Sequence, residues 1–143
     1  MEIFIIEEGK LILSFNYNRC GDFREGLSWV YSNSEAYFID KAGEKAFDAS
    51  FASASDFDGG VARVKEGGKY GLIDKFGNYV LRPKYLNISS FNKYGLAEVE
   101  FVGTSNARFA LINRSGNLLG PYKFSEIRPF SEGLAAVKTK KHW

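Results

Sequence analysis

The 143-residue chain contains one cysteine and one histidine, and these shortages exclude several classes of protein. A single cysteine cannot form an intramolecular disulfide framework. One histidine and one cysteine cannot by themselves complete a tetrahedral zinc site. The histidine is His142, next to last in the sequence, so a Ser-His-Asp or Cys-His arrangement would require the terminus to fold back. We therefore predict a non-enzymatic protein with no catalytic residues, no metal site and no cofactor.

Strong charge and long hydrophobic runs are also missing. The net charge is +2, from 19 basic and 17 acidic residues, whereas a nucleic-acid-binding protein carries a basic face. Glu7 and Glu8 interrupt the first apolar run far short of a membrane span. Glu2 stands where a signal peptide carries positive charge. We expect a soluble cytoplasmic protein that binds neither nucleic acid nor membranes.

Internal repetition is the strongest pattern that is present. Four columns of residues recur with spacings of 34, 34 and 39 positions, with an insertion of about five residues between 102 and 108. The columns are Phe23, Phe57, Phe91 and Phe130; Gly9, Gly43, Gly77 and Gly116; Tyr17, Phe51, Tyr85 and Phe124; and Cys20, Ala54, Ile88 and Ile127. We predict one β-repeat domain over 1–143. Its units are 23–56, 57–90 and 91–129, with partial units at 1–22 and 130–143.

Each unit contains three candidate strands, so the predicted fold is all-β. In the unit that starts at Phe57, the candidates are Val61 to Lys65, a run that ends at Asp74, and a run from Tyr79. The last two are joined by a short turn with Asp or Asn early and Gly late, which is typical of a hairpin. We expect the turn glycines to have positive φ. We also expect the Asp or Asn to bond the turn backbone rather than to act in catalysis.

One stretch supports two interpretations. In the Ala-rich segment from Glu44 to Asp56, Phe47, Phe51 and Ala54 have helical spacing. The repeat register instead places a strand and a corner there. A helix therefore remains an alternative to the strand for this stretch.

The third unit carries a resemblance to a known family. Gly71-Leu72-Ile73-Asp74, Pro83-Lys84-Tyr85 and the octapeptide 130–137 (FSEGLAAV) are similar to the pattern of bacterial WG-repeat (KWG) proteins. The chain departs from the pattern where the family has Trp. Those positions hold Ala36, Tyr70 and Phe109, and Trp143 alone retains Trp. The resemblance implies a binding or scaffold array and supplies no catalytic residues.

Two architectures fit the repeat. Trp143 occupies the same position of the repeat as Glu2, so the given sequence ends close to the point in the repeat at which it starts. A closed, propeller-like ring of four units would pair the last strand with the first hairpin and hide both sheet edges. An open β-repeat array would leave those edges free, and we then expect self-association through them.

Divergence among the units points to a binding site. Two same-face positions of the first strand hold Arg63 and Lys65 in one unit and Glu98 and Glu100 in the next. Their polarity indicates a solvated face. Trp29 and Tyr31 occupy the equivalent positions one unit earlier. Exposed aromatic residues on a polar face are favoured at binding hot spots, although they could instead cover the terminus or a neighbouring unit.

These patterns favour a non-enzymatic binding or scaffold module that recognises a protein or peptide partner. The predicted binding residues are Trp29, Tyr31, Arg63 and Lys65. The alternative is a glycan- or small-molecule-binding repeat domain, in which the aromatic rings would stack on sugar faces.

Overall fold

The computed structural model describes residues 2–7, 10–16, 18–103, 108–120, 123–128 and 137–138, and within these ranges the chain is all-β with no helix. The strands are β1 (Glu2–Glu7), β2 (Lys10–Asn16), β3 (Arg19–Cys20), β4 (Leu27–Ser32), β5 (Glu35–Asp40), β6 (Ser53–Ala54), β7 (Val61–Glu66), β8 (Lys69–Asp74), β9 (Tyr79–Tyr85), β10 (Asn87–Ile88), β11 (Leu96–Glu100), β12 (Phe109–Asn113), β13 (Glu126–Ile127) and β14 (Val137–Lys138). The predicted fold class is thereby confirmed.

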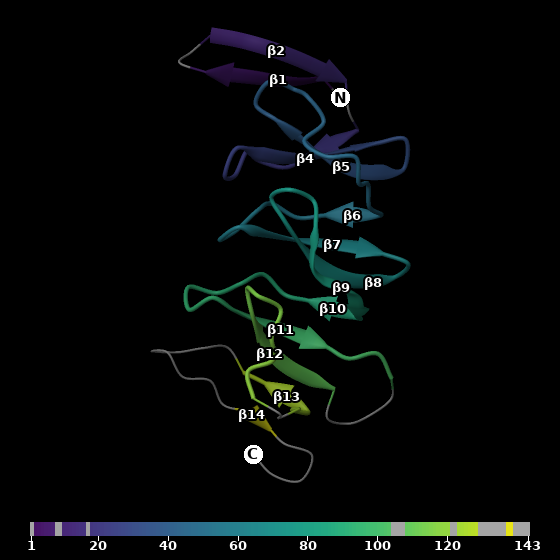
Figure 1. Ribbon diagram of the computed structural model, residues 1–143, viewed down its shortest axis with the longest axis vertical. Coiled ribbons are helices and arrows are strands. Elements are labelled where there is room, and N and C mark those ends of the chain that lie inside the picture. The colour runs from purple at the N-terminus through teal and green to yellow at the C-terminus, as the bar shows by residue number, and fades with distance from the viewer. Residues whose placement is uncertain are drawn as a thin grey trace.

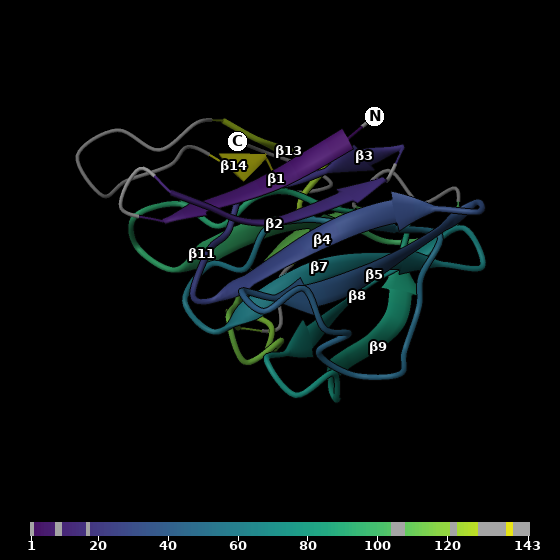
Figure 2. The ribbon, with the colours of Figure 1, turned by 90° about the horizontal axis from the view of Figure 1, so that it is seen from above.

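The strands form small antiparallel sheets that stack along one axis (Figure 1). Three of the sheets are named here: β3–β4–β5 is sheet 1, β6–β7–β8–β9 is sheet 2, and β10–β11–β12 is sheet 3. Viewed along the stack, their hairpins lie over one another (Figure 2). Hairpin β1–β2 and strand β14 lie at opposite ends of the stack. The open array is therefore correct, and the closed ring is wrong.

In sheets 1, 2 and 3, the first strand of the unit lies in the middle of the sheet. Strand β7 pairs with β6 on one side and with β8 on the other, and β4 and β11 do the same in sheets 1 and 3. Hairpins β4–β5 and β7–β8 close through two-residue loops in which both residues have positive φ, as type I′ turns require. The loop φ values are 52° and 67° for Asn33 and Ser34, and 60° and 78° for Gly67 and Gly68.

The turns that follow the second strands form as predicted. In the β8–β9 turn, Asp74 Oδ1 accepts hydrogen bonds from the backbone N–H groups of Phe76 and Asn78, at 2.9 and 3.0 Å. Asp40 and Asn113 bond their own turns in the same way. The turn glycines have the expected positive φ, at 80° for Gly43, 86° for Gly77 and 79° for Gly116. Gly9, the remaining member of this column, lies outside the described residues.

The predicted third strand is only partly present. It forms β2 and β9, whereas the segments that start at Lys45 and at Leu118 make only isolated bridges. Residues 47–50 leave the sheet edge, where Phe47 turns inward and its ring packs 5.6 Å from the ring of Phe38. The segment 44–56 contains no helix, so the register was the better guide there.

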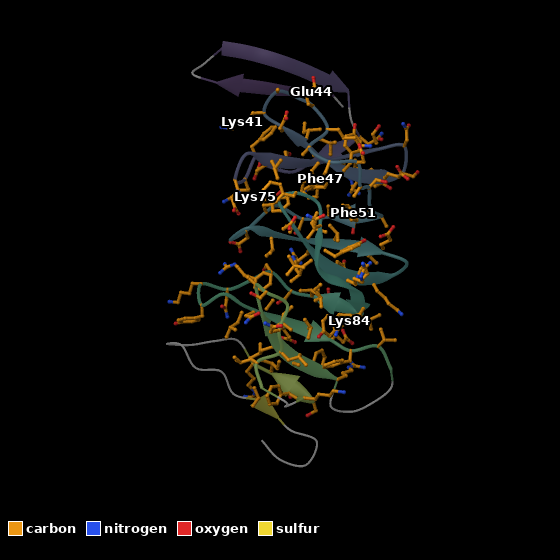
Figure 3. The ribbon with its side chains drawn as sticks, viewed as in Figure 1. Lys41, Glu44, Phe47, Phe51, Lys75 and Lys84 are labelled. Carbon is orange, nitrogen blue, oxygen red and sulfur yellow. The ribbon has the colours of Figure 1, made fainter. Side chains whose placement is uncertain are left out.

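The hydrophobic core lies in layers between successive sheets, where the side chains fill the gaps (Figure 3). One layer joins sheets 1 and 2, and the other joins sheets 2 and 3. Among the repeat aromatics, Phe57 is 2% exposed and Tyr85 is 1% exposed, whereas Phe91 is half-buried. Because alternate residues of its strands point to opposite faces, sheet 2 contributes to both layers and is covered on both faces. No helix in the described part of the chain is long and apolar enough to span a membrane.

Candidate binding pocket between the sheets

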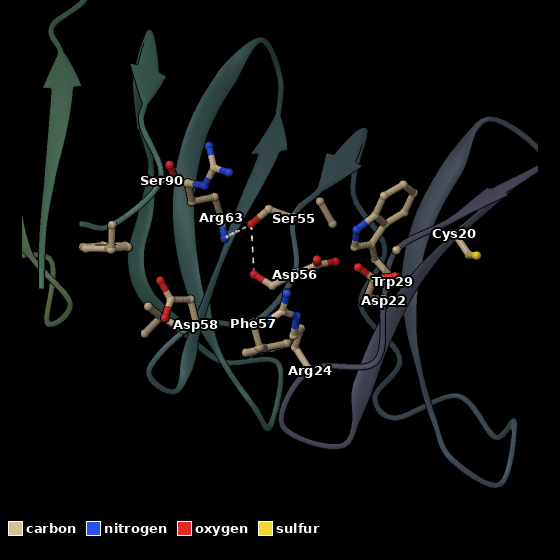
Figure 4. Close-up of a pocket in the computed structure, with 14 residues that line it drawn as sticks. Cys20, Asp22, Arg24, Trp29, Ser55, Asp56, Phe57, Asp58, Arg63 and Ser90 are labelled. Atoms are coloured by element: carbon tan, nitrogen blue, oxygen red, sulfur yellow. Dashed lines mark hydrogen bonds between the residues drawn. The ribbon is translucent and has the colours of Figure 1, made fainter. Parts of the chain in front are cut away.

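A pocket of about 560 Å³ opens on the side of the stack where the short corner strands β3 and β6 lie. Its walls come from sheets 1 and 2, and it extends to Ser90 and Phe91 at the margin of sheet 3 (Figure 4). This volume lies within the range of about 300–1,000 Å³ that is usual for ligand sites. The pocket is therefore large enough to hold one or two side chains of a partner.

The pocket is built from columns of the repeat. Asp22, Asp56 and Ser90 share one column at intervals of 34 residues, and all three line the pocket. Trp29 and Arg63 share another column, on the central strands β4 and β7. Because the units stack in register, each column brings its members to the same side of the molecule. Unit-to-unit differences within a column therefore decide the chemistry of the pocket.

Gly21 and Trp29 depart from the repeat together. In sheets 2 and 3, serines stand at the position of Gly21: Ser55 Oγ accepts a hydrogen bond from the Arg63 N–H at 3.0 Å, and Ser89 Oγ does the same for Glu98 at 2.9 Å. At Gly21 there is no room for such a side chain, because a Cβ there would collide with the Trp29 indole and with Asp56 Oδ1. The glycine is therefore required by the aromatic ring beside it.

Asp56 lies at the centre of the pocket, between Arg63 and Trp29 (Figure 4). Its Oδ1 atom is buried and has no hydrogen-bond partner among the described residues. A buried acceptor without a partner is costly, and more so when it belongs to a charged group. The pocket thus contains a carboxylate whose charge is incompletely compensated by the protein itself.

Arg63 occupies the gap between sheets 2 and 3. Its Nη1 donates a hydrogen bond to the Ile88 carbonyl oxygen at 2.9 Å. Burial lowers the pKa of the guanidinium, while the Tyr70 and Asp56 side chains oppose this shift. Arginine keeps its proton at ordinary pH even so. Arg63 therefore contributes a fixed positive charge to the pocket wall.

The structure brings two of the four predicted site residues together. Trp29 and Arg63 both line the pocket, whereas Tyr31 and Lys65 do not. Tyr31 packs under the Arg19 guanidinium at 5.0 Å, and the Lys65 ammonium lies 5.6 Å from the Tyr70 ring centroid. All four side chains are half-buried. The face that was expected to be solvated is instead largely covered by the next sheet.

The described residues of the pocket provide neither an activated nucleophile nor a set of metal ligands. Cys20 lines the pocket, and burial raises the pKa of its thiol, with Asp22 and Asp56 acting in the same direction. The thiol therefore stays protonated and weakly nucleophilic near neutral pH. Within the described ranges, no three carboxylate, thiol or imidazole groups converge as a metal site would require.

Sequence reasoning missed Gly21, Asp22 and Asp56. A signal for all three was present, because they stand in the corner columns of the repeat and differ there from later units. Comparing the short strand that precedes each central strand would have found them. The sequence does not show directly that the short corner strands β3 and β6 face the same gap between sheets 1 and 2 as Trp29.

The stacked sheets, the turn column and the pocket between units define an open β-repeat array. The family model for the WG containing repeat matches residues 4–34, 38–70, 70–101 and 109–143. These four matches span nearly the whole sequence, and the chain belongs to this family. These matches begin within the second strand of a unit, in β5, β8 and β12, whereas the units read from the sequence begin before the first strand. No curated protein matches the chain.

Proposed function

We propose that the chain is a non-enzymatic binding module that recognises a protein or peptide partner through the pocket between sheets 1 and 2. The observation that carries this proposal is the pocket itself, whose lining includes Trp29 from sheet 1 and Arg63 from sheet 2. Large aromatic residues and arginine in a partly desolvated recess are the residue types that dominate binding at protein interfaces. A rigid array would present this recess without a large loss of conformational freedom.

The lining favours a peptide over a glycan. Five ionisable side chains of both signs face the pocket, namely Asp22, Arg24, Asp56, Asp58 and Arg63. Such groups suit the charged side chains and amide dipoles of a peptide more than the neutral hydroxyls of a sugar. Moreover, Trp29 packs partly against the core layer between sheets 1 and 2, so only part of its ring faces the pocket, less than a sugar needs for stacking.

Selection from a displayed random-peptide library tests the proposal. Enriched peptides should bind the wild-type chain and lose at least tenfold in affinity for Trp29→Ala. Tyr31→Ala is the matched control, because Tyr31 lies on the same strand face but outside the pocket. Its affinity should stay within about twofold of wild type, since residues outside the binding core contribute little.

A second variant distinguishes loss of the binding site from loss of the fold. Trp29 contributes to the core, so Trp29→Ala could lose binding through instability alone. Ser90 is exposed and lines the pocket, and Ser90→Trp would fill the pocket without removing any core contact. Loss of binding in both variants supports the pocket. Undiminished binding by Ser90→Trp, or enrichment of no peptide at all, would refute the proposal.

A glycan titration monitored by Trp fluorescence covers the alternative. A saturable change with a neutral oligosaccharide, blocked by Ser90→Trp, would replace the peptide proposal with the glycan one.

A further inference from the structure

We propose that the Trp29 end of the pocket accepts a basic side chain, lysine or arginine, from the peptide partner. The inference rests on the proposed function and names the chemistry of its ligand.

The local charge is negative at this end. Asp22 and Asp56 lie next to the Trp29 indole (Figure 4), and within the described residues neither forms an ion pair. The third pocket carboxylate, Asp58, is already paired with Arg114, at 3.3 Å between Oδ1 and Nη2. Arg24 also lines the pocket, but it is exposed to solvent and forms no ion pair with these carboxylates. Two carboxylates therefore face the recess without a bound cation.

Asp56 supplies the specific recognition. Its Oδ1 atom is covered and has no hydrogen-bond donor, so a ligand reaches this carboxylate at the other oxygen. A cation bound there would compensate the charge of the whole carboxylate. Hydrogen bonds between ionised partners are stronger than neutral ones, most of all where water is excluded. The Asp56 carboxylate would therefore be stabilised by an incoming positive charge.

Trp29 supplies the second contact. Indole rings attract ammonium and guanidinium groups through their negative faces, and the attraction grows when the cation is desolvated. A carboxylate pair next to an indole therefore favours a cation over a neutral apolar group. An acidic side chain would be repelled by Asp22 and Asp56.

The repeat contains an internal precedent for this ligand. One unit after Trp29, the same position holds Arg63, whose guanidinium fills the gap between sheets 2 and 3 and donates to the Ile88 carbonyl. The equivalent of Ile88 one unit earlier is Ala54, and Ala54 lines the pocket. Sheets 1 and 2 thus offer the same kind of gap and the equivalent carbonyl. The chain places a ring there instead of its own cation, so the cation comes from the ligand.

Titration with single amino-acid derivatives tests the inference. The protein is the full chain carrying Trp143→Phe, labelled with ¹⁵N, so that Trp29 gives the sole indole N–H signal. The probes are the N-acetyl amides of arginine, lysine, norleucine and glutamate, each at constant ionic strength. The arginine and lysine derivatives should shift the Trp29 signal saturably in the millimolar range. The norleucine and glutamate derivatives should bind at least tenfold more weakly.

Asp56→Asn separates recognition from structure. It should weaken binding of the arginine derivative at least tenfold and leave the melting temperature within a few degrees of wild type, because Asp56 forms no ion pair and its covered Oδ1 atom has no hydrogen-bond partner among the described residues. A residue with a merely structural role would instead lower the melting temperature. Asp48→Asn is the matched control, since Asp48 is an exposed aspartate outside the pocket, and binding should be unchanged.

The outcomes distinguish this inference from the proposed function. Preference for norleucine or glutamate would overturn the basic ligand and leave the pocket as the binding site. A Trp29 signal that responds to none of the four probes would also overturn it, and the peptide selection would still judge the pocket on its own. Unchanged arginine binding by Asp56→Asn would overturn the role of that carboxylate and, with it, the inference.

Discussion

The ring of Phe47 lies so close to Gly77 that a Cβ on this glycine would be 2.5 Å from ring carbon Cδ2. One unit later, Leu81 lies over Gly116, with 3.1 Å between its Cβ and the position of an added Cβ. Phe47 and Leu81 occupy equivalent positions of the repeat, as do the two glycines. A turn glycine in one unit thus holds a side chain from the unit before. The glycine column is needed for packing between units as well as for backbone conformation.

Gly77→Val should therefore cost more than positive φ alone would explain. Forcing a β-branched residue to φ 86° costs about 1–3 kcal/mol, and the collision with Phe47 adds about 1–3 kcal/mol more. Urea unfolding should show a loss of about 2–6 kcal/mol, the upper part of which reaches the total stability of a marginal domain.

Gly68→Ala is the control for the backbone contribution. Gly68 also has positive φ, at 78°, but an added Cβ would meet nothing within 4 Å. We expect a loss of about 1 kcal/mol there. Equal losses at Gly68 and Gly77 would mean that the contact with Phe47 contributes nothing.

The phenylalanines that recur at one position of the repeat should not respond uniformly to truncation. Phe57 is 2% exposed and its ring centroid lies 4.9 Å from that of Phe38, so Phe57→Ala should cost about 3–5 kcal/mol. Phe91 is half-buried at the pocket margin, beneath the Arg114 guanidinium, and Phe91→Ala should cost clearly less. Urea midpoints compare the two variants. A larger shift of the urea midpoint for Phe91→Ala than for Phe57→Ala would contradict the greater burial of Phe57.

Gly21 and Trp29 should be energetically coupled. Gly21→Ser restores the serine of the later units but collides with the indole, so it should cost about 2 kcal/mol in the wild-type chain. In a Trp29→Arg background the collision with the indole is gone and only that with Asp56 Oδ1 remains, while the serine can accept the backbone N–H, as Ser55 does for Arg63. The same substitution should then cost clearly less than in the wild-type chain. A double-mutant cycle with no coupling would show that the two departures from the repeat are independent.

Tyr79 should make stability fall at alkaline pH. Burial, together with the hydrogen bond that its hydroxyl donates to Glu66 at 2.7 Å, raises its pKa to about 12. In the unfolded chain the pKa is about 10. Between these values the folded state holds a proton that the unfolded state has lost, so the contribution is complete below pH 10 and is lost as the pH rises towards 12.

Comparison of wild type with Tyr79→Phe isolates this contribution from the other tyrosines. Melting temperatures at pH 8, 10 and 11 should fall less steeply in the variant. Identical slopes would show that Tyr79 titrates alike in the folded and unfolded states.

Much of the fold could be predicted because it is specified locally and repeatedly. The glycines of the turn column need positive φ, and Asp74 bonds its own turn, so both can be recognised in the sequence without knowledge of the tertiary structure. The missing third strand at Lys45 could not be predicted, since it depends on Phe47 turning inward to meet Phe38 across the layer. The repeat register alone does not show whether Phe47 stays in the strand or packs against Phe38.

The site could be predicted only in part for the same reason. Trp29 stands out because it replaces charged residues of other units. Asp56, in contrast, has no distinguishing feature in the sequence apart from its place in a corner column. Its role follows only from the stacking of sheets 1 and 2, which places it beside that ring. The direction of the Trp29 side chain, into the gap between sheets rather than into solvent, also follows from stacking and not from strand alternation.

The most direct test of the binding site is backbone chemical-shift mapping of the ¹⁵N-labelled chain with a peptide taken from the library selection. The account predicts that the largest perturbations fall on residues 20–24, 54–58 and 90–91, which form the pocket walls on three successive corners. Perturbations confined to other surfaces, such as strand β9 or the turn with the exposed Phe76, would contradict it.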